Sequence, residues 1–369
     1  MNIAVITFSD FNTNYGSMLQ AFSMKKYLEE IGHSVTFIRY REFNRPNSER
    51  FDKKMSGCVR KLAINSYKLV KHKDIARTHR NFEVFKDDYF QYTPLYTSSD
   101  EMREKMQKFD CYICGSDQIW NLSCLGGLRT PYFLDFAPSE AIKFSYAASM
   151  GDYHVESCIQ NRFSELLNGL DYIYIREADR IDELQNLTDK KVVSVVDPVF
   201  LNSKEQWQNW IPDSPIKGDY AVCYFVRRSR FGRKIVETMA DEYRMPIYNL
   251  SDNMIYLPKT SSKYISAGPL EFLSILRGAK YAVGTSFHLA AFSIIFDIPI
   301  LTIGMESNRS RIQNILEMAG IKDHFIVENG DYMKIVSSFM GDKMDKTRLL
   351  SEISQSKDYI NIALAIESV

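Results

Sequence analysis

The strongest constraint on the fold is a regular alternation of short β-rich runs with segments of helical periodicity, which continues along most of the 369 residues. The first unit shows the pattern. IAVITF (3–8) predicts a strand, residues 15–32 carry apolar side chains at helical spacing, and SVTFIRY (34–40) predicts the next strand. Strands and helices that alternate in this way form parallel sheets covered by helices. The sequence therefore predicts an α/β fold.

The alternation is interrupted once, and this interruption predicts two domains. The first series of candidate strands ends at VVSVVDP (192–198), where the proline cannot continue an ordinary central strand. A connector follows, and a second alternation begins at YAVCYFV (220–226). We predict domains at 1–200 and 218–345, and the helical pattern of 348–369 is a candidate to pack back on the first domain.

Charge and hydropathy exclude several classes of protein. The 46 Lys and Arg balance the 46 Asp and Glu, so no overall field favours nucleic acid, and any anion must bind through a local arrangement. The longest apolar stretch (290–301) contains Asp297 and Pro299 and falls short of the roughly 20 residues of a membrane span. The first residues lack the basic region of a signal peptide. We expect a cytoplasmic protein without a nucleic-acid partner.

Cysteine usage favours free thiols in a reducing compartment, because six cysteines are scattered through a long chain. Cys111 and Cys114 form a CxxC inside a predicted strand. Residues i and i+3 of a strand point to opposite faces, and no second CxxC completes a zinc site. We expect both cysteines to be buried strand residues, and we expect no metal.

One basic segment departs from the alternation. Residues 52–80 contain nine Lys or Arg and two Asp, and Leu62, Ile64 and Leu69 permit an amphipathic helix. Such a helix can contact anionic lipid headgroups or a pyrophosphate-bearing acceptor. A solvated basic helix on the surface is the alternative. Peripheral contact with the membrane through 52–80 is therefore one of two hypotheses for this segment.

Candidate site residues lie where predicted strands end, because ligands of open α/β sheets bind beyond these ends, near helix N-termini. His288 stands at such a junction in GTSFHLAAF, and its ordinary pKa suits proton transfer near neutrality. Arg176 ends the apolar run YIYIRE, where a guanidinium can bind a carboxylate or phosphate. Further candidates follow other strands: Asn14, Tyr15, Gly16, Ser116, Asp117, Gln118, Trp120 and Arg227.

Several of these candidates have structural alternatives. Asn14 can be an ordinary helix cap, and Trp120 can be a core anchor in a polar turn. Arg176 can pair with a neighbouring acid, and His288 can be a satisfied core residue.

Two familiar arrangements are not expected. The chain has no GxGxxG or Walker loop at its strand ends, so ordinary binding of a dinucleotide or nucleoside triphosphate is not predicted. Ser149, Asp197 and His288 follow the chain order of a serine hydrolase. However, Gly151 to His154 intervene where the helix of a nucleophile elbow must begin, which argues against that reading.

Six motifs in sequence resemble those of the polysaccharide pyruvyl transferase family: NYGSMLQAF, GSDQIWN, SYAASMG, IREAD, DPVFL and GTSFHLAAFSIIFDIPIL. The resemblance covers most of the chain. It implies two Rossmann-like domains that face each other across a cleft, as in GT-B glycosyltransferases. It also implies transfer of an enolpyruvyl unit from phosphoenolpyruvate to a sugar of a lipid-linked glycan precursor, as a cyclic pyruvate ketal, in bacterial capsule or exopolysaccharide biosynthesis.

The resemblance also assigns roles. It implies that His288 is the general acid or base, that Arg176 binds the donor phosphoenolpyruvate, and that Asp117 and Gln118 orient or deprotonate acceptor hydroxyls. No cofactor is implied beyond phosphoenolpyruvate as co-substrate. Contacts from Asn14, Tyr15, Gly16, Ser116 and Trp120 are expected on the acceptor side.

One residue departs from the family pattern. Many members have an arginine two residues before the histidine, where this chain has Ser286 followed by Phe287. The donor contacts are then expected from this loop together with Arg176, Arg311 or the cluster that begins at Arg227. Two alternatives of other classes stay open, namely a GT-B glycosyltransferase that uses a nucleotide sugar and a non-catalytic glycan-binding relative.

Overall fold

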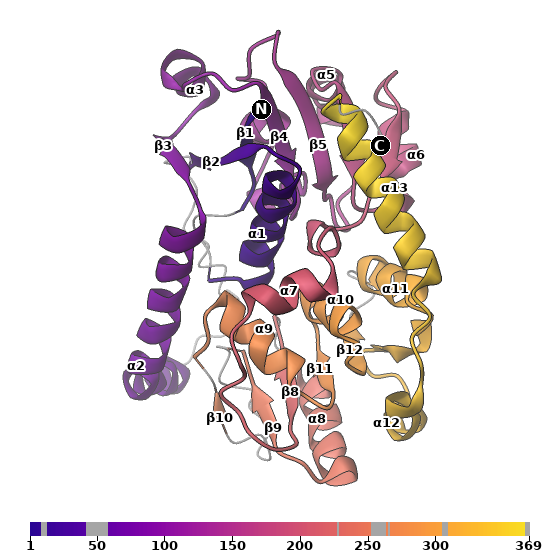
Figure 1. Cartoon of the computed structure of the whole chain (residues 1–369). Helices are drawn as coiled ribbons and strands as arrows, with labels where there is room; N and C mark the ends of the chain where they lie inside the picture. Colours follow the sequence, from indigo (N-terminus) through magenta and orange to yellow (C-terminus); the bar gives the residue numbers. More distant parts are fainter. Residues whose placement is uncertain are drawn as a thin grey trace.

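The computed structural model describes residues 1–8, 13–41, 58–226, 229–251, 263–264, 266–304 and 309–365, with the side chains of 58–72, 75, 263–264 and 309 outside the description. The predicted contacts of segment 52–80 therefore fall largely outside the described residues. The chain forms two halves, one above the other in Figure 1, each built on one parallel sheet with helices around it. The predicted α/β class is confirmed.

The N-terminal half contains a seven-stranded sheet of order β3-β2-β1-β4-β5-β6-β7. This order begins as in Rossmann folds and reverses between β1 and β4, where ligands of such sheets bind. Its strands are β1 Asn2–Ile6, β2 Ser34–Tyr40, β3 Tyr92–Tyr96, β4 Cys111–Gly115, β5 Ile142–Ala148, β6 Tyr172–Ile175 and β7 Val192–Ser194. Its helices include α1 Tyr15–Glu30, α2 Cys58–Tyr89, α3 Ser99–Lys105, α4 Leu122–Leu125, α5 Gln160–Asn168 and α6 Ile181–Gln185.

The C-terminal half repeats the same arrangement in a six-stranded sheet of order β10-β9-β8-β11-β12-β13. Its strands are β8 Ala221–Tyr224, β9 Ile247–Asn249, β10 Lys263–Tyr264, β11 Ala282–Gly284, β12 Ile300–Gly304 and β13 Phe325–Val327. Its helices include α8 Arg230–Tyr243, α9 Pro269–Arg277, α10 Phe287–Phe296, α11 Arg309–Met318 and α12 Met333–Ser338. Helix α7 Lys204–Trp210 lies in the connection between the halves, and α13 Thr347–Ala363 follows the second sheet.

The two cysteines of the CxxC point to opposite faces of the first sheet, as predicted. Cys111 packs in the apolar cluster that contains Phe22 and Phe37. Cys114 packs in a separate cluster with Ile6. Burial raises the pKa of both thiols, and both cysteines are free.

The two halves share one apolar seam. The ring of Tyr15 at the start of α1 stacks on Phe272 of α9 with centroids 4.4 Å apart, and its hydroxyl donates to the carbonyl of Ala267 at 2.9 Å. Two turns further along α1, Trp207 of α7 lies between Phe22 and Phe292, with ring centroids 5.7 and 4.8 Å away. Because α1 and α10 carry the seam, their N-termini are held close to each other.

Helix α13 returns from the second half to the first, and in Figure 1 it runs along the side of both (yellow). The backbone N–H of Val196, just beyond β7, donates to the Ser356 hydroxyl at 3.0 Å. Tyr359 contacts Tyr174 of β6 with ring centroids 5.3 Å apart, and Ile360 is fully buried. The helix therefore completes the apolar cover of the first sheet.

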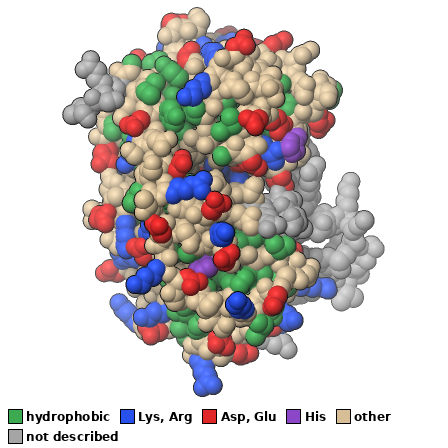
Figure 2. Space-filling view, turned by 90° about the vertical axis from the view of Figure 1, so that its right-hand side faces the viewer, with side chains coloured by type: hydrophobic (Ala, Val, Ile, Leu, Met, Phe, Trp, Pro, Cys, Tyr) green, Lys and Arg blue, Asp and Glu red, His purple; other side chains and the backbone are tan. Residues whose placement is uncertain are grey.

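The surface carries both signs of charge side by side. Figure 2 shows basic and acidic side chains interspersed over this face of both halves, in agreement with the balanced composition. Among the helices described, none is long and apolar enough to cross a membrane.

Replacing Ile360 tests the docking of α13. Ile360→Ala removes a fully buried side chain and is expected to lower the free energy of unfolding by about 2–5 kcal/mol in chemical denaturation. The matched control is Ile362→Ala on the same helix, whose side chain is 52% exposed, and its effect should stay within about 0.5 kcal/mol. Equal losses for the two variants would contradict this packing.

Candidate active site between the two sheets

The loops that follow the strands of the first sheet meet those of the second at a cavity of about 120 Å³. Because both sheets are parallel and reverse their order at the same position, these loops gather at the reversal points. The N-terminal half contributes Asn14, Asp117, Gln118 and Arg176 to the lining, and the C-terminal half contributes Val226, Thr285, Ser286, Phe287, His288, Arg311 and Ile312.

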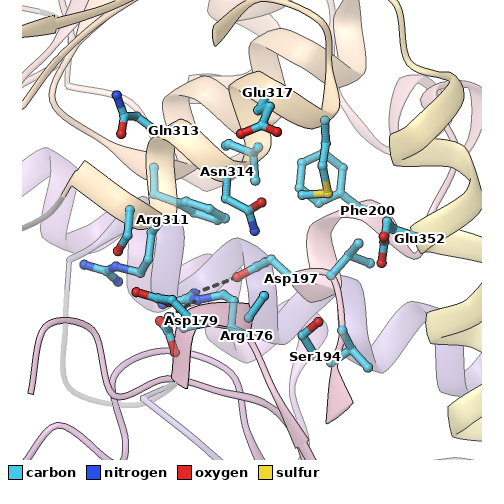
Figure 3. Close-up of a pocket in the computed structure, with 18 residues that line it drawn as sticks. Arg176, Asp179, Ser194, Asp197, Phe200, Arg311, Gln313, Asn314, Glu317 and Glu352 are labelled. Carbon is cyan, nitrogen blue, oxygen red and sulfur yellow. Dashed lines mark hydrogen bonds and ion pairs between the residues drawn. The ribbon is translucent and has the colours of Figure 1, made fainter. Parts of the chain in front are cut away.

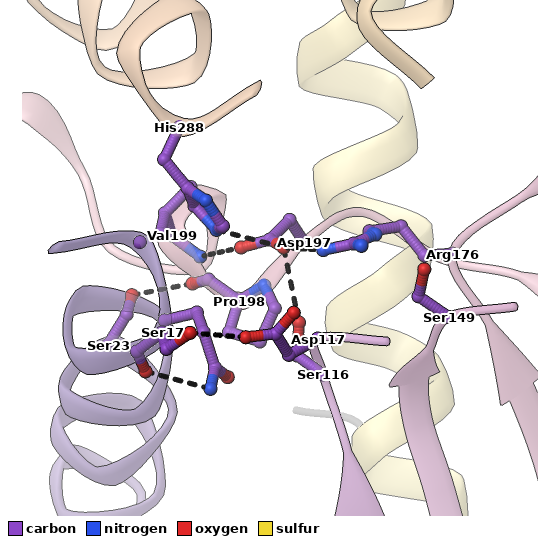
Figure 4. Close-up of polar contacts among 12 residues, drawn as sticks. Ser17, Ser23, Ser116, Asp117, Ser149, Arg176, Asp197, Pro198, Val199 and His288 are labelled. Atoms are coloured by element: carbon purple, nitrogen blue, oxygen red, sulfur yellow. Dashed lines mark hydrogen bonds and ion pairs between the residues drawn. The ribbon is translucent and has the colours of Figure 1, made fainter. Parts of the chain in front are cut away.

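A buried carboxylate, Asp197, connects the two halves at this cavity (Figure 4). Its Oδ2 accepts a hydrogen bond from Arg176 Nη1 at 2.8 Å and from Ser116 Oγ at 3.1 Å. Its Oδ1 accepts from the backbone N–H of Val199 at 3.1 Å. His288 of the second half places Nε2 at 3.6 Å from Oδ2, which is beyond hydrogen-bond length but within ion-pair range.

The charges around Asp197 and Arg176 keep both side chains ionised. Burial by itself would raise the pKa of Asp197, but His288 and Arg176 outweigh burial and hold that pKa well below its ordinary range. Burial would lower the pKa of Arg176, yet Glu177 and Asp197 raise it. Asp197 and Arg176 are therefore both ionised at neutral pH.

Glu177 is fixed by the loop after β5. The Ser149 hydroxyl and the Met150 N–H both donate to its carboxylate, the latter at 3.2 Å. Arg176 Nε lies 3.6 Å from Glu177 Oε1. Because the Ser149 hydroxyl is bonded to Glu177 and not to His288, Ser149, Asp197 and His288 form no nucleophilic triad in spite of their chain order.

His288 occupies the second position of α10, and its ring lies against α1. Ser286 caps the helix by accepting the Leu289 N–H at 3.3 Å. A Cβ added to Gly16 would lie 2.0 Å from His288 Nδ1, so only glycine allows this approach. Nε2 faces Asp197 and is buried without a hydrogen bond to any residue that the structure describes, and Nδ1 is the ring atom nearest Gly16. The imidazole therefore lines the cavity with Nε2 beside a carboxylate.

Asp117 faces the same cavity from a left-handed backbone conformation with φ of 66°. This conformation is uncommon for a residue with a side chain, and it aims the carboxylate across the loop. One oxygen accepts a hydrogen bond from Ser17, and the other accepts from the Gln118 N–H at 2.8 Å. The Gln118 side-chain oxygen in turn accepts from Asn121 at 2.8 Å.

Arg311 of α11 brings a second guanidinium to the cavity. It lines the cavity, and within the described part of the chain it makes no ion pair or hydrogen bond. Burial and the charge of Arg176 lower its pKa. A partly desolvated cation beside a second cation is stabilised by a bound anion. Arg176, in contrast, is neutralised by Asp197 and Glu177, and its guanidinium lies over the Phe287 ring at 5.0 Å.

Three predicted contacts need correction or reassignment. Trp120 is fully buried, stacks on Phe133 and donates its Nε1–H to the Tyr132 carbonyl at 2.9 Å, so it is a core anchor and not a sugar contact. Tyr15 belongs to the seam described above. Ser116 directs its hydroxyl to Asp197, so it supports the buried carboxylate and does not face an acceptor.

Two other residues complete the comparison with the sequence. Arg227 lies outside the described residues. Asp197 is the site residue that sequence reasoning missed, because it was considered only as the end of a strand and in the hydrolase order. The available signal is a single acid directly after an apolar strand and before proline, in VVSVVDP.

The fold and the position of the cavity define a GT-B-like protein, and solved structures of this class are similar to the chain. The UDP-GlcNAc 2-epimerase of Methanocaldococcus jannaschii is 13% identical with a TM-score of 0.55, over 99% of this chain and 100% of that one. The UDP-N-acetylglucosamine 2-epimerase of Rickettsia bellii is 10% identical with a TM-score of 0.52, over 99% and 96%. Arabidopsis thaliana UGT89C1 complexed with UDP-L-rhamnose is 10% identical with a TM-score of 0.51, over 99% and 95%. The likeness concerns the fold alone, and it confirms the predicted GT-B-like architecture.

The family follows from the sequence itself. The profile of the polysaccharide pyruvyl transferase family matches residues 14–307, so the chain belongs to this family and the predicted resemblance is confirmed. Membership supports a transferase that acts in polysaccharide biosynthesis. A comparison with curated proteins finds no match.

Replacing Gly16 tests the contact between α1 and His288. Alanine in a helix is normally more stabilising than glycine by roughly 0.5–1 kcal/mol, but here its Cβ would overlap the imidazole, which typically costs about 1–3 kcal/mol. Gly16→Ala is therefore expected to lower the free energy of unfolding. The double variant Gly16→Ala/His288→Ala should recover stability relative to His288→Ala alone. A stabilised Gly16→Ala single variant would show that the ring does not occupy this place.

Replacing Asp197 tests the buried ion pair and its pH dependence. Asp197→Asn leaves Arg176 with less compensation and is expected to cost about 3–5 kcal/mol of unfolding free energy at neutral pH. The folded-state pKa of Asp197 is depressed, so its contribution is present above the ordinary pKa of about 4 and is lost as the pH falls below it. The difference between wild type and variant should therefore narrow in acid. An exposed control, Asp323→Asn, should show little effect, and a pH-independent difference for Asp197→Asn would argue against the pair.

Proposed function

We propose that the protein transfers the enolpyruvyl unit of phosphoenolpyruvate to two hydroxyls of a sugar, forming a cyclic pyruvate ketal and releasing phosphate. The observation that carries the proposal is that His288, Arg176 and Arg311 line one cavity between the sheets, with the carboxylate of Asp197 bonded to Arg176 and within ion-pair range of His288, in a chain of this family.

The donor needs cations, because phosphoenolpyruvate carries both a carboxylate and a phosphate. Arg311 offers a guanidinium that makes no ion pair or hydrogen bond with any described residue, although the charges of Glu177, Asp117 and Asp152 favour its charged form. Arg176 offers hydrogen-bond donors at a fixed position, although Asp197 and Glu177 already compensate its charge. Arg311 thus takes the part that the arginine missing at Ser286 plays in many members of the family.

The reaction needs a proton at carbon and must dispose of two hydroxyl protons. Protonation of the donor methylene gives a methyl group and an oxocarbenium-like centre, which the first sugar hydroxyl attacks. Phosphate then leaves, and the second hydroxyl closes the ketal ring. Of the two hydroxyl protons, one balances the proton delivered to the methylene carbon and the other leaves on phosphate. His288 suits the transfer because its imidazole lines the cavity, and the fixed carboxylate of Asp197 beside Nε2 favours positive charge on the ring.

The acceptor side is assigned to Asp117 and Gln118, which face His288 across the cavity. Asp117 accepts from Ser17 and from the Gln118 backbone, and this fixes its carboxylate to orient an incoming hydroxyl. We assign no cofactor beyond the co-substrate. The acceptor is proposed to be a lipid-pyrophosphate-linked sugar, with the basic segment 52–80 holding the protein at the inner face of the membrane.

Phosphate release tests this function. The protein is incubated with phosphoenolpyruvate and lipid-pyrophosphate sugars of the galactose and mannosamine types, and inorganic phosphate is followed. His288→Ala should lower turnover by about two to four orders of magnitude with a nearly unchanged melting temperature. Arg311→Ala should raise the KM for phosphoenolpyruvate about tenfold or more, and Arg311→Lys should recover part of it.

The matched control is Arg162→Ala, an exposed arginine of α5 that pairs with Glu165 far from the cavity, and it should behave as wild type. Consumption of a nucleotide sugar without phosphate release from phosphoenolpyruvate would identify a glycosyltransferase instead. Binding of glycans without any turnover would identify a non-catalytic relative.

A further inference from the structure

A second, larger cavity of about 290 Å³ shares a wall of Arg176, Phe287 and Arg311 with the first. Figure 3 shows the larger cavity. These three residues line both cavities, so the two spaces adjoin. The larger space is bounded by the ends of β6 and β7 below, by α11 above and by α13 at one side. None of the site residues predicted from the sequence belongs to it except those of the shared wall.

Several polar side chains of this cavity have no partner. Asn314 of α11, Ser194 of β7 and Glu352 of α13 each make no side-chain hydrogen bond or ion pair to the residues that the structure describes. In Figure 3 the Asn314 amide and the Glu352 carboxylate both point into the space from different helices. An amide, a hydroxyl and a carboxylate that converge without partners are suited to bind several hydroxyl groups.

Charge is distributed unevenly over the lining. Both cations, Arg176 and Arg311, lie in the shared wall, whereas Asp179, Glu317 and Glu352 lie in the remaining lining. Only Glu317 of these acids has an ion-pair partner among the described residues, Arg348 at 3.0 Å. A nucleoside diphosphate in this space would face uncompensated carboxylates, so a polyanionic ligand is disfavoured. A neutral ligand avoids this cost.

The remaining lining is apolar and partly aromatic. Phe200, buried beside Asp197, and Phe287 contribute rings, and Val196, Ile315 and Met318 contribute aliphatic surface. A few polar groups placed around apolar walls are the usual construction of a small-molecule pocket. The volume corresponds to roughly ten waters at about 30 Å³ each, which is comparable to one sugar ring.

We propose that the larger cavity binds the pyranose ring of the acceptor, with hydroxyls on Asn314, Ser194 and Glu352 and one edge directed past Phe287 into the smaller cavity, where Asp117 and Gln118 orient the reacting hydroxyls toward the donor. The ligand class is a neutral, hydroxyl-rich sugar. This inference rests on the proposed function for the donor side. It adds specificity residues on α11 and α13 that contact no part of the donor.

Binding of simple glycosides tests the cavity directly. Methyl β-galactopyranoside, methyl β-glucopyranoside and N-acetylmannosamine are titrated by ligand-observed NMR, with phosphoenolpyruvate and UDP in parallel titrations. At least one glycoside should bind the wild type. Asn314→Leu should weaken that glycoside about tenfold or more and change the affinity for phosphoenolpyruvate less than about twofold. Gln355→Leu, on an exposed position of α13, is the control and should leave all affinities unchanged.

A second variant separates loss of binding from loss of folding. Glu352→Trp fills the cavity from a half-buried position of α13 and should exclude the glycoside to the same extent while the melting temperature stays near that of wild type. The inference is overturned if no glycoside binds, if both variants leave glycoside affinity unchanged, or if they weaken UDP instead. Loss of glycoside binding in a protein that never binds phosphoenolpyruvate would support the cavity and refute the proposed reaction.

Discussion

The interaction on which this structure depends is the buried pair of Arg176 and Asp197, whose side chains are only 5% and 0% exposed. Removing two charges from water is costly unless each is fully coordinated. Ser116 and the Val199 N–H complete the shell of the carboxylate, and Glu177 approaches the guanidinium. The pair joins the ends of β6 and β7. It therefore fixes the floor of the site before any ligand arrives.

The same pair is also the contact point of the second half, through His288. His288 reaches Asp197 only because α10 begins against α1, and α1 offers Gly16 at the point of contact. In the aromatic seam, Tyr15 joins α1 to α9 through Phe272, and Trp207 of α7 joins α1 to α10 through Phe22 and Phe292. The packing of the two halves therefore also fixes the position of the His288 imidazole. Movement of one half against the other would change the distance between His288 and Asp197.

The sequence predicted the architecture well, because strand and helix periods are local properties. Short strands at the sheet edges are harder to predict. Strand β3 lies at an edge and carries Pro94, and β13 has only three residues, so neither shows a clear alternation of apolar and polar side chains. The ends of the predicted strands point to His288, Arg176 and Asp117, which line one cavity, since parallel strands bring their carboxyl ends together. Which side of a loop faces the core depends on contacts with distant residues, so the local sequence does not predict it. For this reason the sequence does not decide that Trp120 is a core residue, and it does not reveal that Asp197 contacts both Arg176 and His288.

The return of α13 to the first sheet has a consequence for biosynthesis. Val196 at the end of that sheet bonds to Ser356, 160 residues further along the chain. A ribosome therefore releases the strands of the first half long before the helix that covers them exists. Apolar surface around Tyr174 stays open during this interval, when exposed surface favours aggregation. The first half therefore lacks part of its apolar cover until α13 has been synthesised.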